Sequence, residues 1–463
     1  MTRFTKSASL AAVLTGIGLS GAVPTSAATT DSIDGRWSAS LTTQTGQVIP
    51  FRLDISGSGA SLKGTLYDGF DPYETTTSAT FENGQLTLNI DHYLTTITAN
   101  EKDGQLTGTV VAHNRGSSSQ YAFQATHYVK PAAGAAAPAI AGSWEIPLET
   151  PSSKGEKAFR LIVKQNGPEV AASILRVDGD TGSYSGTYQD GKWVLSHFDG
   201  SRPGVIVVIP QTDGTLQVLQ NPEHPNAIAA SAGATTVKTS GKTYDDAISD
   251  GRYAPALVAY RSEVARAKGL PEPENYETHT TVRDPNEKFT FNFPDVDGHL
   301  ISNDDPRFKG KVVLAIVTGT WCPNCHDEAQ YLVKLDKKYR DKGLAIVALD
   351  FEEPEQQGSL ARERAFVKQY GVKYTYLIAG APAEMWEKVP QAVNLNTWPA
   401  TFFIGRDGRV RGVHSGFASP ASGEFNRQMQ KEFTSKIETL LTETPAQDPT
   451  KTAAAANAKA GPG

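Results

Sequence analysis

The only two cysteines of this 463-residue chain lie in one short motif, Trp321-Cys322-Pro323-Asn324-Cys325. Two thiols at this spacing can form and exchange a disulfide, because a thiolate attacks a disulfide sulfur through a mixed-disulfide intermediate. An apolar run before the motif and a helical pattern after it predict a strand that ends where a helix begins. Backbone N–H groups at such a helix end stabilise a thiolate. We therefore expect Cys322 to attack and Cys325, one turn further and shielded, to resolve.

Two neighbours of the thiols extend this chemistry. Pro323 suits the first helical position, where its missing N–H would be unbonded anyway. Glu328 lies three residues beyond Cys325, on the same helical face. A partly buried carboxylate there would raise the pKa of the cysteines and would shuttle protons during exchange. The alternative interpretation is a solvated glutamate on the helix surface, since glutamate is seldom buried without a partner.

The elements that must position this motif alternate between strands and helices, which is typical of an α/β domain. Apolar runs predict the strands, of which the one directly before the motif has the composition of a buried parallel strand. Apolar residues at helical spacing predict the helices. The expected strands are 289–293, 311–317, 344–349, 375–379, 398–404 and 410–414, and the expected helices are 327–339, 362–370, 384–395 and 424–441.

This order resembles thioredoxin, and more closely its secreted relatives of the TlpA/ResA type, which are periplasmic or extracytoplasmic thiol-disulfide oxidoreductases. The resemblance covers residues 285–443 and is carried by the W-C-x-x-C, by Glu328 and by Pro399 before the penultimate strand. It implies that Pro399 is a cis-proline packed against the disulfide, with the backbone before it pairing with a substrate strand. Trp321, Trp398 and Pro399 are the substrate-binding residues that it implies.

The chain departs from the family at two places and from cytoplasmic thioredoxins at a third. Trp398 stands where a small or β-branched residue is expected, which suggests either a distinctive docking surface or a ring packed on the domain. Ala329-Gln330 replace a family proline, so the helix should be straighter. Cytoplasmic thioredoxins carry a buried aspartate on the strand before the motif, where this chain has Ile316, so we expect Glu328 to act alone.

Other interpretations of the C-x-x-C fit less well. A zinc site would need two further cysteine or histidine ligands, and although His326 is adjacent there is no second pair. An inert structural disulfide is disfavoured by Trp321, by Pro323 and by the strand-to-helix location. A peroxiredoxin-like peroxidase would need a Thr-x-x-Cys context, which residues 318–322 do not supply. We predict no metal and no cofactor.

The first half of the chain contains an internal similarity at offsets of 107 to 110 residues. An Asn-Gly or Asp-Gly turn recurs in both copies, and one match, Gly64 with Gly186, falls at an offset of 122 and suggests a rearranged middle. The four matched segments begin at Asp34 and Ala141, Phe51 and Phe159, Phe81 and Tyr188, and Asp103 and Asp213. A duplicated unit is therefore expected.

Each copy alternates apolar and polar residues between tight turns, which predicts an antiparallel meander of seven or eight strands in a barrel or sandwich. The last strand is expected at 121–128 in the first copy and at 253–260 in the second, although 255–268 also fits a helix. The Gly-x-Trp that opens each copy resembles the first strand of lipocalin-type barrels. The alternative is a tryptophan that plugs a barrel core. Either way we expect a binding or spacing module.

Composition and the N-terminus place limits on function. A net charge of −6 without a basic stripe excludes a nucleic-acid footprint. Arg3, Lys6 and the apolar stretch 8–23 predict a secretion signal cleaved after Ala27, with an uncleaved membrane anchor as the alternative. Exported proteins often carry structural disulfides, and this chain has no cysteine outside the motif. The thiols are therefore expected to be reactive rather than structural.

Together these features predict two repeated antiparallel β barrel or sandwich domains followed by an α/β thioredoxin-like domain. The expected parts are a signal peptide at 1–27, β domains at 28–130 and 142–262 with an insertion near 221–243, linkers at 131–141 and 263–284, the thioredoxin-like domain at 285–443 and a disordered tail at 444–463. The expected function is an exported, periplasmic or extracytoplasmic thiol-disulfide oxidoreductase that reduces protein disulfides and is recharged by a membrane or periplasmic electron donor. The alternative is a ligand-binding or partner-binding protein with an auxiliary redox domain.

Overall fold

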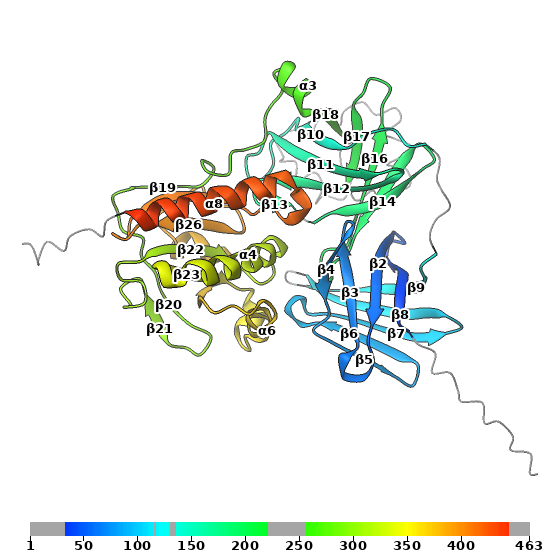
Figure 1. The fold of residues 1–463 in the computed structure, drawn as a ribbon, viewed down its shortest axis with the longest axis horizontal. Helices are drawn as coiled ribbons and strands as arrows, with labels where there is room; N and C mark the ends of the chain where they lie inside the picture. The colour runs from blue at the N-terminus through cyan, green and yellow to red at the C-terminus, as the bar shows by residue number, and fades with distance from the viewer. Residues whose placement is uncertain (1–32, 115–116, 130–135, 181, 221–255, 444–463) are drawn as a thin grey trace, which may run out of the picture. The chain divides into compact units, whose positions relative to one another are not determined.

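A five-stranded sheet in the order β24-β23-β22-β26-β27 forms the centre of the C-terminal domain (Figure 1). The computed structural model describes residues 33–114, 117–129, 136–180, 182–220 and 256–443. Three strands of this sheet run parallel, β22 (Val312–Thr318), β23 (Leu344–Phe351) and β24 (Thr375–Gly380). β26 (Ala400–Ile404) runs antiparallel to β22, and β27 (Val410–Ser415) runs antiparallel to β26.

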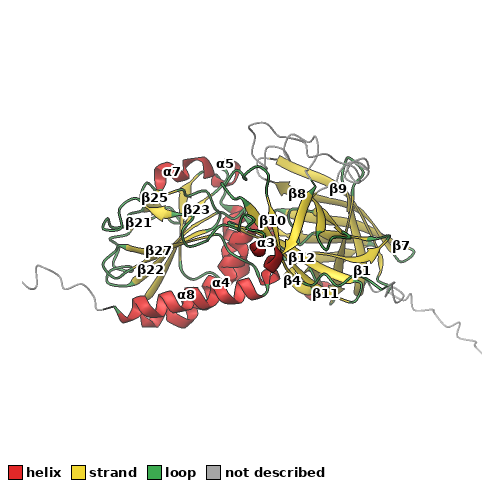
Figure 2. Cartoon of the chain, turned by 90° about the horizontal axis from the view of Figure 1, so that it is seen from above, coloured by secondary structure: helices red, strands yellow, loops and turns green. Residues whose placement is uncertain are grey.

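Both faces of this sheet are covered, as the continuous apolar composition of its central strand requires. Successive side chains of β22 point to opposite faces, so Leu314 and Ile316 join one buried cluster while Ala315 and Val317 join another. Figure 2 shows α4 and α8 on one side of the sheet and α7 on the other. The helices are α4 (Pro323–Tyr339), α5 (Pro354–Gln357), α6 (Ala361–Tyr370), α7 (Met385–Lys388) and α8 (Glu424–Thr442).

These elements confirm the predicted thioredoxin-like arrangement, with one helix much shorter than expected. The helix predicted over 384–395 is limited to α7, which ends at Lys388. Pro390 is the cause, because proline has no N–H for the helical ladder and disfavours helical backbone at the residue before it. The chain instead forms a short strand, β25 (Ala392–Val393), that pairs with β19 (Thr281–Val282). A hairpin of β20 (Asn292–Pro294) and β21 (Leu300–Ser302) stands in place of the strand expected at 289–293.

The second β domain is a closed barrel. Eight antiparallel strands follow the order β11-β10-β18-β17-β16-β15-β14-β12, and pairing between β12 and β11 closes the ring. The strands are β10 (Gly142–Pro147), β11 (Ala158–Asn166), β12 (Glu169–Arg176), β13 (Gly179–Asp180), β14 (Tyr184–Gln189), β15 (Lys192–His197), β16 (Gly204–Pro210), β17 (Leu216–Gln220) and β18 (Leu257–Arg261). Strand β13 forms a hairpin with β12 outside the ring.

The first β domain is a nine-stranded antiparallel sheet in the order β4-β3-β2-β1-β9-β8-β7-β6-β5. The Thr76 N–H, directly after β4, donates to the Gly64 carbonyl of β3 at 3.0 Å and extends the pairing of these two strands. The strands are β1 (Gly35–Thr42), β2 (Val48–Ser56), β3 (Lys63–Asp68), β4 (Asp71–Thr75), β5 (Ser78–Glu82), β6 (Gln85–Ile90), β7 (Thr95–Lys102), β8 (Gln105–Asn114) and β9 (Ser117–His127). The meander thus has nine strands rather than seven or eight.

The two β domains place their strands in the same spatial order, so that β1 to β9 correspond to β10 to β18. The Asn-Gly and Asp-Gly turns fall between corresponding strands, β5 and β6 in one domain and β14 and β15 in the other. Gly64 lies in β3, whereas Gly186 lies in β14, the counterpart of β5, so that match does not follow the strand order. The duplication of one unit itself stays a prediction.

The tryptophans that open the two domains are both buried. Trp37 stacks on His127 with ring centroids 3.9 Å apart. Trp144 lies under the Arg261 guanidinium, and its indole N–H donates to the Ile140 carbonyl at 2.9 Å. Trp144 belongs to a cluster of buried apolar side chains contributed by the strands of the second barrel. Both tryptophans are therefore buried core residues of their domains, and the lipocalin resemblance stays a prediction.

The end of the second β domain combines both sequence interpretations. Strand β18 occupies the C-terminal part of the expected strand at 253–260, and helix α3 (Ser262–Ala267) follows it directly. The predicted signal peptide, part of the first linker, the insertion near 221–243 and the tail at 444–463 lie outside the described residues. Within the described part of the chain, every helix is too short or too polar to cross a bilayer.

Candidate active site

The redox motif lies at the junction of β22 and α4. Cys322 is the N-terminal capping residue of α4, and Pro323 is the first residue of the helix, as predicted. The Cys322 N–H donates to the Gly319 carbonyl at 3.0 Å, and the Cys325 N–H donates to the Cys322 carbonyl at 3.0 Å. Both cysteines are free thiols, with only 3% of Cys322 and 1% of Cys325 exposed. This backbone holds the two sulfurs within one turn of each other.

The two thiols differ in acidity. Burial raises the pKa of Cys322, but a hydrogen bond from Cys325 and the charge of Arg202 outweigh it, so that this pKa lies below its ordinary value. Burial, the hydrogen bond to Cys322 and the Cys322 charge together hold the pKa of Cys325 well above its ordinary value. One thiol therefore ionises easily while its partner keeps its proton. Arg202 belongs to the loop between β15 and β16, and the sequence contained no signal for its proximity.

Trp398 and Pro399 lie against Cys322. The peptide bond between them is cis, as the resemblance implied. The Cys322 thiol donates to the Trp398 carbonyl at 3.5 Å, so the backbone before the proline faces the sulfur. The Trp398 ring packs edge-to-face on Trp321 and on Phe351, with centroids 5.1 and 5.8 Å apart. Of the two interpretations of Trp398, the structure shows a ring packed on the domain.

Glu328 is buried rather than solvated, with 1% of its surface exposed. Burial raises its pKa to about 8, against a hydrogen bond donated by the Thr401 hydroxyl and in concert with the Cys322 charge. The interpretation as a surface glutamate is therefore wrong. Ile316 stands where cytoplasmic thioredoxins carry an aspartate, so β22 offers Glu328 no second carboxylate. The hydrogen-bond donor of Glu328 is Thr401, which pairs with Ile316 across β22 and β26. The position of Thr401, two residues after Pro399, was the available sequence signal for this hydrogen-bond donor.

His326 is a neutral, fully buried side chain. Its Nε2 donates to the Thr320 carbonyl at 2.6 Å, and its Nδ1 accepts from the Tyr370 hydroxyl at 2.9 Å. Burial and the charge of His92 hold its pKa well below the ordinary value. Both ring nitrogens are committed to these hydrogen bonds, so His326 has no lone pair left for zinc. That the C-x-x-C is not a zinc half-site stays a prediction.

A hairpin of the second β domain covers the redox motif within the single compact unit formed by residues 34–463. The Asn324 side chain, between the two cysteines, donates to the Asp178 carbonyl at 2.7 Å, and the Phe417 N–H donates to the same carbonyl at 3.2 Å. Gly179 forms a parallel bridge with Phe417, directly after β27. The hairpin backbone thus adds to the edge of the redox domain beside Cys322, which explains the low exposure of this thiol.

This contact depends on close backbone approach and on one buried carboxylate. A Cβ at Gly179, where φ is +111°, would lie 2.0 Å from the Phe417 carbonyl oxygen. The Asp180 carboxylate accepts from the Ser419 N–H at 2.9 Å, from the Ser419 hydroxyl at 2.6 Å and from the Ser422 hydroxyl. Sequence reasoning missed this contact, because residues more than 200 positions apart carry it.

The first β domain reaches the same helix end. The Tyr73 hydroxyl donates to the Asp327 carboxylate at 2.7 Å, and Tyr93 stacks on His326 with centroids 4.2 Å apart. Burial and the charge of Asp180 hold the pKa of Asp327 well above its ordinary value. Side chains from both β domains therefore enclose the first turns of α4.

A strand–turn–helix junction with two thiols, a cis-proline and a buried glutamate defines a thioredoxin-like redox domain. Residues 282–427 match the Redoxin family model. The chain is 31% identical over 143 residues to the thiol-disulfide oxidoreductase ResA of Bacillus thuringiensis subsp. konkukian, which covers 31% of this chain and 72% of that relative. It is 34% identical over 110 residues to the thioredoxin-like protein YneN of Bacillus subtilis, covering 23% and 58%.

Among solved structures, a thiol:disulfide interchange protein of the thioredoxin family from Chlorobium tepidum aligns with a TM-score of 0.26 and 23% identity, covering 35% of this chain and 99% of that one. The chain belongs to the ResA-like thiol-disulfide oxidoreductases of the redoxin class. Members of this class act on protein thiols and disulfides.

The raised pKa of Glu328 predicts a pH-dependent stability that Glu328→Gln should remove. An unfolded glutamate titrates near 4.5 and the folded one near 8, so the folded state binds more protons between these values. Wild-type stability therefore falls as pH rises from about 4.5 to 8 and levels off above it. Relative to the wild type, Glu328→Gln should gain on the order of a few kcal/mol across this window. Denaturant unfolding at several pH values measures it, with the exposed Glu355→Gln as control; parallel curves for all three proteins would contradict the assignment.

Loosening the hairpin should expose Cys322. Asp180→Asn removes an acceptor for two serines, and each hydrogen bond to a charged group contributes about 1.5–3 kcal/mol. In a Cys325→Ser background, we expect iodoacetamide to alkylate Cys322 about tenfold faster or more than in the parent, since 1.4 kcal/mol corresponds to a factor of ten. Asp213→Asn, in an exposed turn of the same domain, should leave the rate unchanged. An unchanged rate in folded Asp180→Asn would show that this contact does not limit access.

Proposed function

We propose that this chain is an exported thiol-disulfide oxidoreductase that reduces protein disulfides by dithiol exchange at Cys322 and Cys325. The observation that carries this proposal is the unequal acidity of two thiols at one helix end, a pKa below the ordinary value for Cys322 and far above it for Cys325. A thiolate at the N-terminus of α4 is the nucleophile that such an exchange requires.

The reaction consists of two sulfur transfers. The Cys322 thiolate attacks one sulfur of the substrate disulfide, whose S–S bond breaks, and the departing thiolate takes up a proton from solvent. Cys325 then loses its proton and attacks the Cys322 sulfur of the mixed disulfide, releasing the second substrate thiol. Two electrons have moved to the substrate, and the enzyme holds a Cys322–Cys325 disulfide. An external dithiol donor, in the membrane or the periplasm, must return the two electrons.

Glu328 serves as the acid–base group of the second transfer. Its pKa near 8 lets it exist in both protonation states close to neutral pH, the condition under which a carboxyl group both accepts and returns a proton. The Thr401 hydroxyl orients the carboxylate from the strand that follows Pro399. A buried carboxylate also disfavours a second negative charge nearby, so ionised Glu328 disfavours the thiolates and supports a reductase rather than an oxidant.

The substrate would dock on the backbone around the cis-proline. Trp398 presents its carbonyl to Cys322, and we assign to the backbone of Trp398 and Pro399 the pairing with an extended substrate segment. Trp321 and the Trp398 ring shape the wall beside them. The hairpin at Asp178 and Gly179 occupies the neighbouring edge, so a protein substrate must displace it.

The two β domains, proposed copies of one unit, act in this scheme as covers for the redox domain rather than as ligand carriers. Buried apolar side chains, including Phe159 and Trp193, occupy the interior of the second barrel. A filled interior favours a packed core over a lipid or glycan cavity. In the proposed domain organisation, a signal peptide at 1–27 precedes the first β domain, and linkers at 131–141 and 263–284 flank the second.

A substrate trap tests the roles of the two cysteines. With oxidised insulin as the probe, Cys325→Ser should accumulate a mixed disulfide at Cys322, because the resolving thiol is missing. Cys322→Ser, the matched control, should form none, and the wild type should reduce insulin without accumulating the adduct. Non-reducing electrophoresis with mass spectrometry of the adduct makes the measurement. An adduct on Cys325 in the Cys322→Ser protein would reverse the assigned roles.

The equilibrium potential of the pair tests the direction of the reaction. Equilibration of the full chain with glutathione buffers should give a value nearer to about −270 mV, typical of a reductant, than to about −120 mV, typical of a strong oxidant. Acid quenching and alkylation of the remaining thiols report the fraction reduced at each ratio. A value near −120 mV would reject the reductase while leaving dithiol exchange intact.

A further inference from the structure

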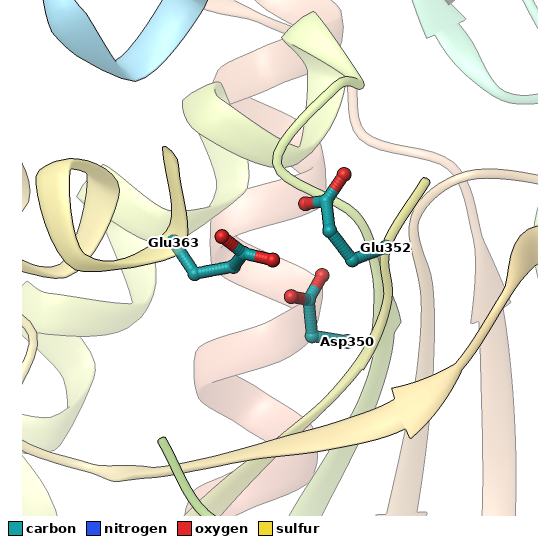
Figure 3. Close-up of side chains that lie close together, drawn as sticks. All are labelled: Asp350, Glu352 and Glu363. Atoms are coloured by element: carbon teal, nitrogen blue, oxygen red, sulfur yellow. The ribbon is translucent and has the colours of Figure 1, made fainter. Parts of the chain in front are cut away.

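A cluster of buried carboxylates lies behind the redox motif, on the α6 side of the sheet. Asp350 is near the end of β23, Glu352 follows this strand, and Glu363 is in α6. All three side chains have 0% of their surface exposed. One carboxylate oxygen of each lies within 4.8 Å of the others. Figure 3 shows the three carboxylates converging on a shared space.

Part of this charge is balanced within the protein. The Arg362 guanidinium contacts Glu352 and also Glu353, at 2.8 Å for the latter. Glu352 accepts further hydrogen bonds from the Thr320 hydroxyl and from the Glu353 N–H at 2.8 Å. None of these hydrogen bonds and ion pairs involves the side chains of Asp350 and Glu363.

Asp350 and Glu363 have no hydrogen-bond donor among the described residues. Both oxygens of each side chain are buried and without a partner. The hydroxyl of Tyr376, a buried residue of β24, lies near enough to Asp350 to oppose the rise of its pKa, but no hydrogen bond of normal geometry joins the two. Tyr376 pairs with Ala348, two residues before Asp350, and so belongs to the same face of the sheet. Four carboxylate oxygens thus lack a hydrogen bond of normal geometry in one place, with a neutral hydroxyl beside them.

The balance of charge demands a further positive group. Four carboxylates and one guanidinium would carry three net negative charges if all were ionised. Isolated buried carboxylates are strongly disfavoured, and in proteins they either take up protons or coordinate a metal. Burial and neighbouring carboxylates raise the pKa of Glu363 to about 7 and that of Asp350 well above its ordinary value. Either bound protons or a bound cation must therefore neutralise part of the negative charge of the cluster.

We propose that Asp350, Glu352 and Glu363 bind a hard divalent cation, of the class of Ca²⁺, Mg²⁺ and Mn²⁺, with the Tyr376 hydroxyl beside it. Carboxylate and hydroxyl oxygens are the ligands that these ions prefer, whereas zinc and copper favour nitrogen and sulfur. A divalent ion reduces the net charge of the cluster to a single negative charge. Asp350 and Glu363 gain the partner that they lack in the protein itself.

The site would support the redox motif from behind. Thr320, which donates to Glu352, directly precedes the W-C-P-N-C, and its carbonyl accepts from His326 at 2.6 Å. The Trp321 indole donates to the carbonyl of Phe351, between Asp350 and Glu352, at 2.9 Å. A cation at the cluster would therefore stabilise the backbone of residues 350–352. That backbone in turn anchors Thr320 and Trp321, which directly precede Cys322.

Thermal unfolding of the full chain tests the proposal. After chelation with EDTA and removal of the chelator, Ca²⁺, Mg²⁺ or Mn²⁺ at neutral pH should raise the Tm of the wild type, because an ion that binds only the folded state stabilises it. Elemental analysis should find about one ion per chain. The double variant Asp350→Asn with Glu363→Gln should lose both the shift and the ion. Glu355→Gln, an exposed carboxylate of α5, should keep both.

Two results would overturn the site. No Tm shift and no bound ion with any of the three metals would leave protons as the answer. A shift that persists in the folded double variant would place the ion elsewhere. Should the double variant fail to fold, Glu363→Gln alone gives the same comparison. None of these outcomes depends on the cysteines, so a failed cation site leaves the thiol chemistry untouched.

Discussion

The junction at which β22 ends and α4 begins is the constraint on which the rest of this structure depends. A buried parallel strand delivers Cys322 to the capping position of a helix, where the free N–H groups of the first turn favour a thiolate. The same helix turn carries Cys325 inward, away from those groups. Burial, the hydrogen bond between the two thiols and the charge of Arg202 give the thiols their opposed pKa directions at this junction, and every proposed step of the exchange uses this difference.

Burial raises the pKa of several carboxyl groups around this junction. Glu328, Asp327 and Asp350 are carboxyl groups whose pKa values lie above the ordinary range because each is enclosed. Their partners differ: Thr401 and Tyr73 each donate to one of the first two, while Asp350 has no donor among the described residues. Such differences separate a group tuned to exchange protons near neutral pH from one that awaits a ligand. The hydrogen-bond partners that packing supplies therefore distinguish these carboxyl groups, although all three are buried acidic residues.

The sequence predicted those parts of the fold that local pattern controls. The alternation of strands and helices, the capping role of Cys322, the cis peptide at Pro399 and the position of Glu328 could all be read from spacing and resemblance. The helix expected over 384–395 ends at Lys388 because Pro390 breaks the helical pattern that its apolar residues suggest. Thr401, Arg202 and the hairpin at Asp178 were not foreseen, because each reaches the site from elsewhere in the fold.

Enclosure of the nucleophile sets a condition on how this protein works. In the proposed exchange, Cys322 meets a protein disulfide only when the hairpin at Gly179 leaves the edge next to Phe417. Two neutral hydrogen bonds to the Asp178 carbonyl, each worth about 1 kcal/mol net, and three bonds to the Asp180 carboxylate, each worth about 1.5–3 kcal/mol, hold it there. Interfaces between domains of one chain commonly permit relative motion. A small open population is enough for turnover, while the closed state shields the thiolate from adventitious oxidation. The β domains then determine how often the redox pair reacts, while the junction of β22 and α4 determines what it does.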